Sequence, residues 1–155
     1  HGEIAAMIAD YGGTDLLCYR ADGPAELIAR QCAAWDPLLD WAAEGLGAPL
    51  ATGAGIVHVN QPPDSLAKLS ARVHALDPFS LAAMHYLVAL SGSLVIGLAA
   101  LERHLPAAAL WDMSRIDETW QAEQWGADDA AAEAAAEKRA AFLHAAQVLA
   151  FLNAK

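Results

Sequence analysis

The side chains that could act as nucleophiles or bind nucleotides do not form a recognisable catalytic pattern. Ser91 and Ser93 lie inside an apolar run, a poor position for an exposed nucleophile, and no serine, histidine and acid fall in a known nucleophile motif. Gly53 and Gly55 could begin a dinucleotide fingerprint, but His58 holds the third glycine position and a strand is expected there, whereas a phosphate site needs a helix N-terminus. The sequence therefore predicts no catalytic residue and no cofactor.

Residue types that bind metals are present, but their spacing does not predict a metal site. The six histidines include no pair at ligand spacing with a carboxylate beside it, so His58, His74 and His85 are expected to be structural. The acid pairs at 117–118 and 128–129 could attract a divalent ion, but acids that flank a helix start are ordinary capping residues. No metal is predicted.

The residues best suited to binding another protein lie near the end of a predicted helix that Gly126 should stop. Trp120 and Trp125 flank acidic, polar sequence, and such aromatic side chains often anchor interfaces. Glu123 has no base three or four residues away, so no ion pair can form within its own helix, and the helix C-terminus disfavours a carboxylate. Glu123 is therefore either a solvated surface residue or a partner for a cation on another protein. The predicted partner-binding residues are Glu123, Trp120, Gln124 and Trp125.

Length and charge exclude several classes of protein. A chain of 155 residues suits one domain, and its formal net charge of −10 repels nucleic acid and anionic lipid surfaces. Between Asp112 and Glu137 there are eight acidic side chains and one basic side chain, so this segment should attract a basic partner. Cys18 and Cys32 are isolated in the sequence, which indicates reduced thiols in a reducing compartment.

Local patterns predict a mainly helical chain with two short strands. Apolar residues at three- and four-residue spacing indicate buried helical faces, and Asp-Pro pairs mark helix starts. Pro37 is expected to kink or restart the helix that contains it. The predicted helices cover residues 3–10, 24 to about 42, 62–75, 77–103, 106–126 and 128–152, and the predicted strands cover 14–20 and 55–59.

The segment from Leu81 to Leu101 contains 21 residues without a formal charge, which is long enough to span a membrane. It also contains polar residues and glycines, and it has no aromatic anchors or one-sided basic flank. Ala89, Ser93 and Gly97 are spaced four apart and form a small-residue edge that would let neighbouring helices approach closely. The segment is therefore predicted to be the buried central helix of a soluble bundle without stable membrane insertion.

Several motifs, in this order, resemble the ATP synthase assembly factor twelve family, chaperones of the alpha subunit of the catalytic head. They include Thr-Asp-Leu-Leu-Cys-Tyr-Arg-Ala at 14–21, Gln31, Trp-Asp-Pro-Leu-Leu-Asp-Trp at 35–41, Gln-Pro at 61–62, Leu-Asp-Pro at 76–78, Ser-Gly-Ser at 91–93 and Trp-Gln-Ala-Glu-Gln-Trp-Gly at 120–126. The resemblance covers nearly the whole chain. It implies a mainly helical C-terminal domain with a small strand element and no nucleotide or metal. Family members carry a further N-terminal domain that nothing here matches, so residues 1–155 are expected to form a single domain of a longer chaperone.

The resemblance implies a non-enzymatic protein that keeps unassembled alpha subunit of the F-type ATP synthase from aggregating until beta subunit replaces it. The protein is also expected to be a monomer. It implies a mitochondrial matrix or bacterial cytoplasmic location, and the alanine-rich composition favours the bacterial cytoplasm. The alternative is a small-molecule-binding or hydrolytic helical domain with its site between helices. A deep apolar pocket would favour that alternative, and a shallow exposed surface with Trp120, Glu123 or Trp125 would favour the chaperone. Glu123→Lys is expected to leave stability unchanged or slightly improved while weakening alpha-subunit capture.

Overall fold

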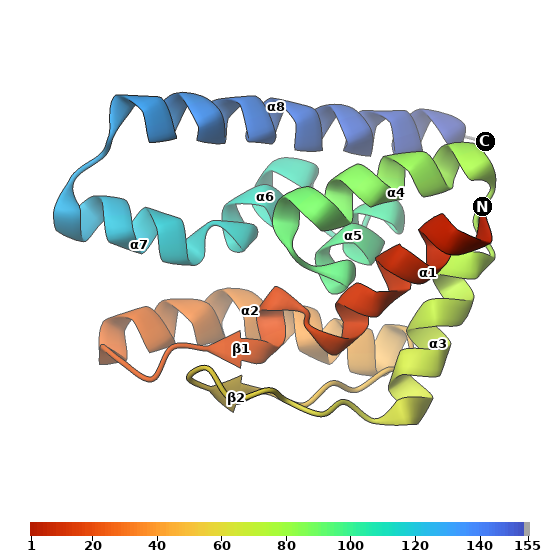
Figure 1. Ribbon diagram of the computed structural model, residues 1–155, viewed down its shortest axis with the longest axis horizontal. Helices are drawn as coiled ribbons and strands as arrows, with labels where there is room; N and C mark the ends of the chain where they lie inside the picture. The colour runs from red at the N-terminus through yellow and green to blue at the C-terminus, as the bar shows by residue number, and fades with distance from the viewer. Residues whose placement is uncertain (154–155) are drawn as a thin grey trace.

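The computed structural model describes residues 1–153, which form eight α-helices and one two-stranded parallel sheet (Figure 1). The helices are α1 (Gly2–Asp10), α2 (Ala25–Gly45), α3 (Pro63–His74), α4 (Pro78–Ser91), α5 (Leu94–Leu101), α6 (Ala107–Ser114), α7 (Ile116–Trp125) and α8 (Asp129–Leu152), and the strands are β1 (Tyr19–Arg20) and β2 (Gly53–Ala54). The predicted fold class, a mainly α bundle with a central apolar helix and a small two-stranded element, is confirmed.

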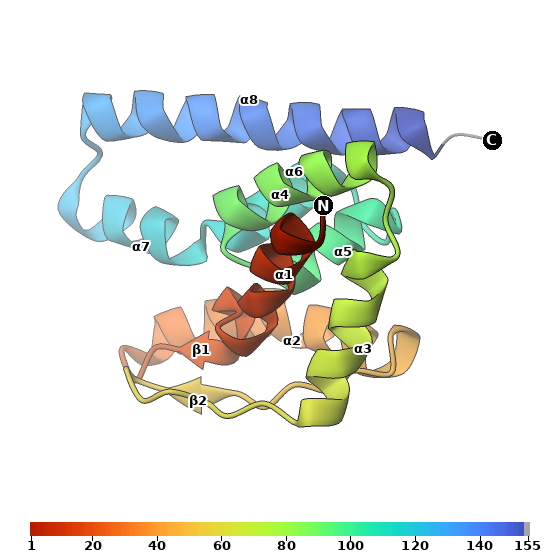
Figure 2. The same cartoon turned by 45° about the vertical axis from the view of Figure 1, so that its right-hand side comes forward.

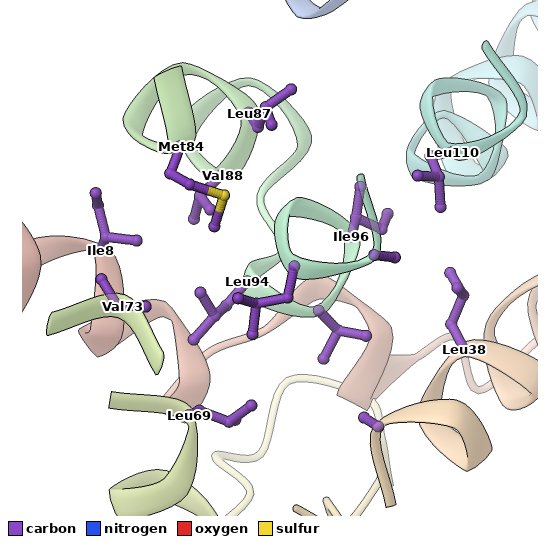
Figure 3. Close-up of a cluster of buried hydrophobic side chains, with 14 of the residues drawn as sticks. Ile8, Leu38, Leu69, Val73, Met84, Leu87, Val88, Leu94, Ile96 and Leu110 are labelled. Carbon is purple, nitrogen blue, oxygen red and sulfur yellow. The ribbon is translucent and has the colours of Figure 1, made fainter. Parts of the chain in front are cut away.

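The helices enclose one core that lies between two long helices. In Figures 1 and 2, α8 runs along one side of the molecule, α2 and the sheet lie on the opposite side, and α4, α5 and α6 lie between them. Figure 3 shows side chains from several elements converging on this core, including Ile8 of α1, Leu38 of α2, Leu69 of α3 and Leu110 of α6. The core therefore joins segments from both ends of the chain.

The central apolar segment consists of two helices, so the prediction of one helix over 77–103 was wrong. Gly92 ends α4 with φ +74°, a left-handed conformation that glycine adopts without a steric cost. Ser93 then begins α5, because its hydroxyl oxygen accepts a hydrogen bond from the backbone N–H of Ile96. Within the described residues, no helix is long and apolar enough to cross a membrane. The buried central helix is the shorter α5, in which Leu94 through Ala99 are buried.

The break at Gly92 also separates the predicted small-residue edge. Ala89 is exposed on α4, Ser93 caps α5, and Gly97 lies on the buried face of α5, so the three residues do not share a helix face. Gly97 does permit a close helix contact as predicted. A Cβ atom at this position would lie 2.6 Å from Cγ2 of Val88 and 3.2 Å from Cε of Met84, both on α4.

Gly97→Leu is expected to destabilise the fold by about 1–3 kcal/mol, because the added side chain must displace α4 from α5. Chemical denaturation monitored by circular dichroism measures this change. Gly2→Leu is the matched control, since no atom lies within 4 Å of a Cβ atom placed there. Equal stability of Gly97→Leu and the unmodified protein would contradict this account of the α4–α5 contact.

Both predicted strands are shorter than expected or displaced. In the segment 14–20, residues Leu16–Cys18 form a 3₁₀ turn that Asp15 caps, and the strand consists of Tyr19 and Arg20. The predicted strand at 55–59 does not form, because the ladder ends where the backbone N–H of Gly55 donates to the carbonyl of Arg20 at 2.9 Å. Residues 56–59 instead form a largely exposed loop, in which Ile56 is fully exposed.

One further helix boundary differs from the prediction. The helix α2 continues through Pro37 as one element, so of the two expected effects of Pro37 the restart does not occur. The predicted helix over 106–126 divides at Arg115 into α6 and α7, and Arg115 has the non-helical angles φ −109° and ψ 18°. This division lets α7 turn away from the core toward α2, as Figure 1 shows.

Candidate partner-binding surface

The helix α7 carries the four predicted partner-binding residues and makes polar contacts with α2. Asp117 lies in its first turn, where a carboxylate is favourable for the helix dipole. The buried side chain of Gln31 donates to the carboxylate of Asp117 at 2.7 Å and accepts from the backbone N–H of Ala21 at 2.9 Å. Gln31 therefore joins the segment after β1 to α7 through α2.

Trp120 faces inward, and its predicted role in partner binding stays a prediction. Its side chain is 7% exposed, and the guanidinium carbon of Arg30 lies 4.9 Å from the centre of its ring. A cation over an indole face is an attractive arrangement. Trp120 consequently supports the position of Arg30 rather than presenting its own ring to solvent.

Glu123 has a partner within the chain. Arg30 of α2 donates two hydrogen bonds to its carboxylate, at 2.8 and 2.7 Å. These hydrogen bonds lower the pKa of Glu123 and raise the pKa of Arg30, because each charge stabilises the other. The expectation of a locally unfavourable, unpaired carboxylate considered α7 alone. It missed Arg30, which is 93 residues away in the sequence and has no local signal that connects it to α7.

The remaining two predicted residues lie on the exposed end of α7. Gln124 is exposed, and Trp125 is 83% exposed although its indole is a large apolar group. The exposed end of α7 therefore combines an aromatic ring with the half-exposed Arg30–Glu123 pair. We call Arg30, Glu123, Gln124 and Trp125 the α7 surface.

Two open grooves border α8. One, of about 640 Å³, lies between α7 and the first half of α8 and includes Trp111 and Trp125 in its lining. The other, of about 660 Å³, lies beside the second half of α8 and is lined by Ala100, by residues 103–107 and by Leu143, Ala146, Gln147 and Ala150 of α8. Among residues 1–153, no three His, Cys, Asp or Glu side chains are grouped so that they could hold a metal ion.

The buried titratable groups lie away from both grooves. Burial raises the pKa of Asp15, although hydrogen bonds from backbone groups, that of Val95 first among them, oppose this effect. Burial raises the pKa of the Cys18 thiol to about 12, so it is not ionised at neutral pH. Neither residue lines a groove. These two groups therefore support the fold and are not positioned to react with a ligand.

Comparisons with known proteins relate the chain to one family. A family model described as ATP12 chaperone protein matches residues 1–43. The crystal structure of Atp12 from Paracoccus denitrificans is 49% identical, with a TM-score of 0.93 over 96% of this chain and 64% of that chain. A solved structure of a protein from Agrobacterium tumefaciens is 38% identical, with a TM-score of 0.88 over 95% of this chain and 55% of that chain.

The chain thus spans less than two thirds of the length of these matched chains. The similarity nevertheless extends along nearly all of this chain in both sequence and backbone. Its high TM-scores agree with the helical order and the small parallel sheet described above. This chain belongs to the ATP12 chaperone family.

Proposed function

We propose that this protein is a non-enzymatic chaperone for assembly of the F-type ATP synthase catalytic head. It binds unassembled alpha subunit and covers an apolar surface of that subunit until beta subunit takes its place. Family membership supports the chaperone class. A chaperone that binds the unassembled subunit lowers the concentration of its aggregation-prone free form by mass action.

The observation that carries this proposal is the exposure of Trp125 on an acidic surface. An indole that is 83% exposed gains free energy when a partner covers it, and tryptophan is enriched among residues that dominate binding energy. Glu123 and Gln124 lie beside it in α7, and we propose that they contact basic or polar groups of the alpha subunit. Trp120 contributes indirectly, because its ring supports Arg30 and hence the orientation of Glu123.

The alternative, a small-molecule-binding or hydrolytic domain with a site between helices, has less support. Such a site would combine an enclosed apolar pocket with converging polar groups whose pKa values are shifted. The two grooves are open to solvent, and Asp15 and Cys18 line neither of them. A shallow surface that carries Glu123 and Trp125 fits a protein partner better.

We further propose that the protein works as a monomer in a bacterial cytoplasm. Both organisms named above are bacteria. A net charge of −10 disfavours self-association through mutual repulsion. Analytical ultracentrifugation is the direct test of the monomeric state.

Glu123→Lys and Trp125→Ala are each expected to weaken capture of alpha subunit by about tenfold, as loss of a central interface contact typically does. The measurement is retention of purified, unassembled alpha subunit on the immobilised protein, together with light scattering of alpha subunit as it aggregates. Added beta subunit should release the retained alpha subunit. If the unmodified protein neither retains alpha subunit nor reduces its aggregation, the proposed function is wrong.

Two controls separate binding from folding. Glu133→Lys makes the same charge change at an exposed position on α8 that does not line the groove. Glu123→Lys breaks the pair with Arg30, so we now expect a small loss of stability instead of the unchanged or improved stability predicted from α7 alone. Adding Arg30→Glu restores an ion pair of reversed orientation. Full recovery of alpha-subunit capture by this double variant would contradict a direct role of the negative charge on α7.

A further inference from the structure

The first half of α8 projects beyond the core and makes little contact with the rest of the domain. The helix contains 24 residues, and from Asp129 to Ala141 every residue except Ala135 is exposed. Phe142 is its first buried residue. Figures 1 and 2 both show this half of α8 separated from α7, with the two helices joined at the end of the molecule by the segment 126–128. The high helix propensity of alanine explains how this half remains helical without a packed face.

One face of this projecting half is shaped for helix packing. Ala131, Ala132, Ala135 and Arg139 line the groove toward α7 and recur at helical spacing, whereas Glu133 lies outside the groove lining. Small side chains let two helix axes approach to about 8 Å. Across the groove, Trp125 supplies exposed aromatic surface, whereas Trp111, which also contributes to the lining, is only 4% exposed. Two helices and the indole of Trp125 therefore form the walls of a space that lies open to solvent.

The charges around this groove indicate what it binds. Its lining contains four acidic residues, Asp112, Asp117, Glu118 and Asp128, and two basic residues, Arg115 and Arg139. Glu118 neutralises Arg115 at 3.2 Å. The surrounding segment from 112 to 137 carries eight acidic side chains and one basic side chain. A ligand with apolar groups facing the alanines and cationic groups at its edges would be complementary to both the shape and the charge.

We propose that the α7–α8 groove binds an amphipathic helix of the client, with small or apolar residues against α8 and Lys or Arg residues at its edges. This inference rests on the proposed chaperone function and assigns the form in which the client is held. The bound helix completes a three-helix arrangement with α7 and α8. Trp125 belongs to both the groove and the α7 surface, so the two sites are continuous.

The test fills the groove without changing charge. Ala132→Trp places an indole in the groove, and Ala134→Trp places the same side chain on the same helix outside the groove lining. Binding of two probes is compared with the unmodified protein: unassembled alpha subunit and a synthetic amphipathic helix of lysine and leucine carrying a fluorophore. Ala132→Trp should weaken binding of both probes by about tenfold, and Ala134→Trp should leave both unchanged. Circular dichroism should show the same helix content and thermal unfolding for both variants.

The other outcomes separate this proposal from the function on which it rests. If Ala132→Trp retains alpha subunit as the unmodified protein does, the groove proposal is overturned and the chaperone function stands. If the unmodified protein does not retain alpha subunit, the chaperone function fails and the groove proposal fails with it. If the unmodified protein is a dimer and Ala132→Trp converts it to a monomer, the groove proposal is also overturned, because a second copy of the chain then occupies the groove. Equal binding of a glutamate and leucine helix would overturn the assigned charge of the ligand.

Discussion

Asp15→Ala is expected to destabilise this protein by about 2–5 kcal/mol, because it leaves two buried backbone N–H groups without an acceptor. The carboxylate of Asp15 is fully buried and accepts from Leu17 at 3.0 Å and from Val95 at 2.9 Å. The first bond caps the 3₁₀ turn before β1, and the second caps the N-terminus of α5. In addition, the N–H of Leu16 donates to the carbonyl of Gly92 at 3.0 Å. This segment therefore fastens the N-terminal part of the chain to the α4–α5 junction.

Urea denaturation of the Asp15→Ala variant measures this loss. Asp40→Ala is a suitable control, because Asp40 is exposed on α2 and should change stability by less than about 0.5 kcal/mol. A total stability of about 5–15 kcal/mol is usual for a domain, so a loss of this size is a large fraction of the free energy of unfolding. If the Asp15 variant is as stable as the Asp40 control, the two hydrogen bonds do not fasten the junction.

The effect of Asp15→Ala is also expected to depend on pH. Burial raises the pKa of Asp15 above its ordinary value near 3.8, so the folded protein holds this proton more tightly than the unfolded chain does. The contribution of Asp15 to the free energy of unfolding is then fully present below the ordinary pKa. This contribution decreases as pH rises through the raised pKa. The stability difference between the unmodified protein and the variant should therefore be largest in acid and narrow toward neutral pH. A difference that widens as pH rises would contradict the raised pKa.

Trp35→Ala is expected to cost about 3–5 kcal/mol, since it removes a large, fully buried side chain and leaves a cavity. The indole N–H of Trp35 also donates to the carbonyl of Met113 at 2.7 Å, which joins α2 to α6. The guanidinium carbon of Arg20 lies 5.4 Å from the centre of the same ring, and Arg20 in turn pairs with Asp36 at 2.8 Å. Loss of this ring should therefore loosen the contact between α2, β1 and α6.

Trp125→Ala is the matched control for Trp35→Ala, because it makes the same substitution on a ring that is 83% exposed. Its thermal unfolding should differ little from that of the unmodified protein, whereas its capture of alpha subunit should weaken. Trp35→Phe keeps most of the apolar volume and should fall between Trp35→Ala and the unmodified protein. Equal destabilisation by the two alanine variants would show that Trp35 is not the tryptophan that supports the core.

The sequence motifs that carry the family resemblance include residues with structural contacts that no motif could specify. Gln31 connects Ala21 to Asp117, Asp15 caps two elements, and Trp35 bonds to the backbone of α6. Their residue types indicated that these side chains are buried or matter for the fold. The partners became visible once the helices were packed, because the contacts with Asp117, Val95 and Met113 join residues 86, 80 and 78 positions apart in the sequence.

The sequence by itself determined the mainly helical fold, most helix starts and the buried central segment. These features depend on local chemistry: Asp77 and Asp128 cap helices, and apolar spacing defines buried faces. Its Ser-Gly-Ser motif even contained the break between α4 and α5, since a glycine that ends a helix precedes a serine that begins one.

Tertiary structure decided the surface of α7 and the extent of the sheet. Glu123 lacks a partner in its own helix but finds Arg30 on α2, and Trp120 turns inward while Trp125 remains exposed. Helical spacing shows which side chains share a face of one helix. It does not show which face packs against the domain, because that depends on contacts such as Gln31 with Asp117. Strand length likewise depended on where β1 and β2 met, because a ladder continues only while both backbones run side by side.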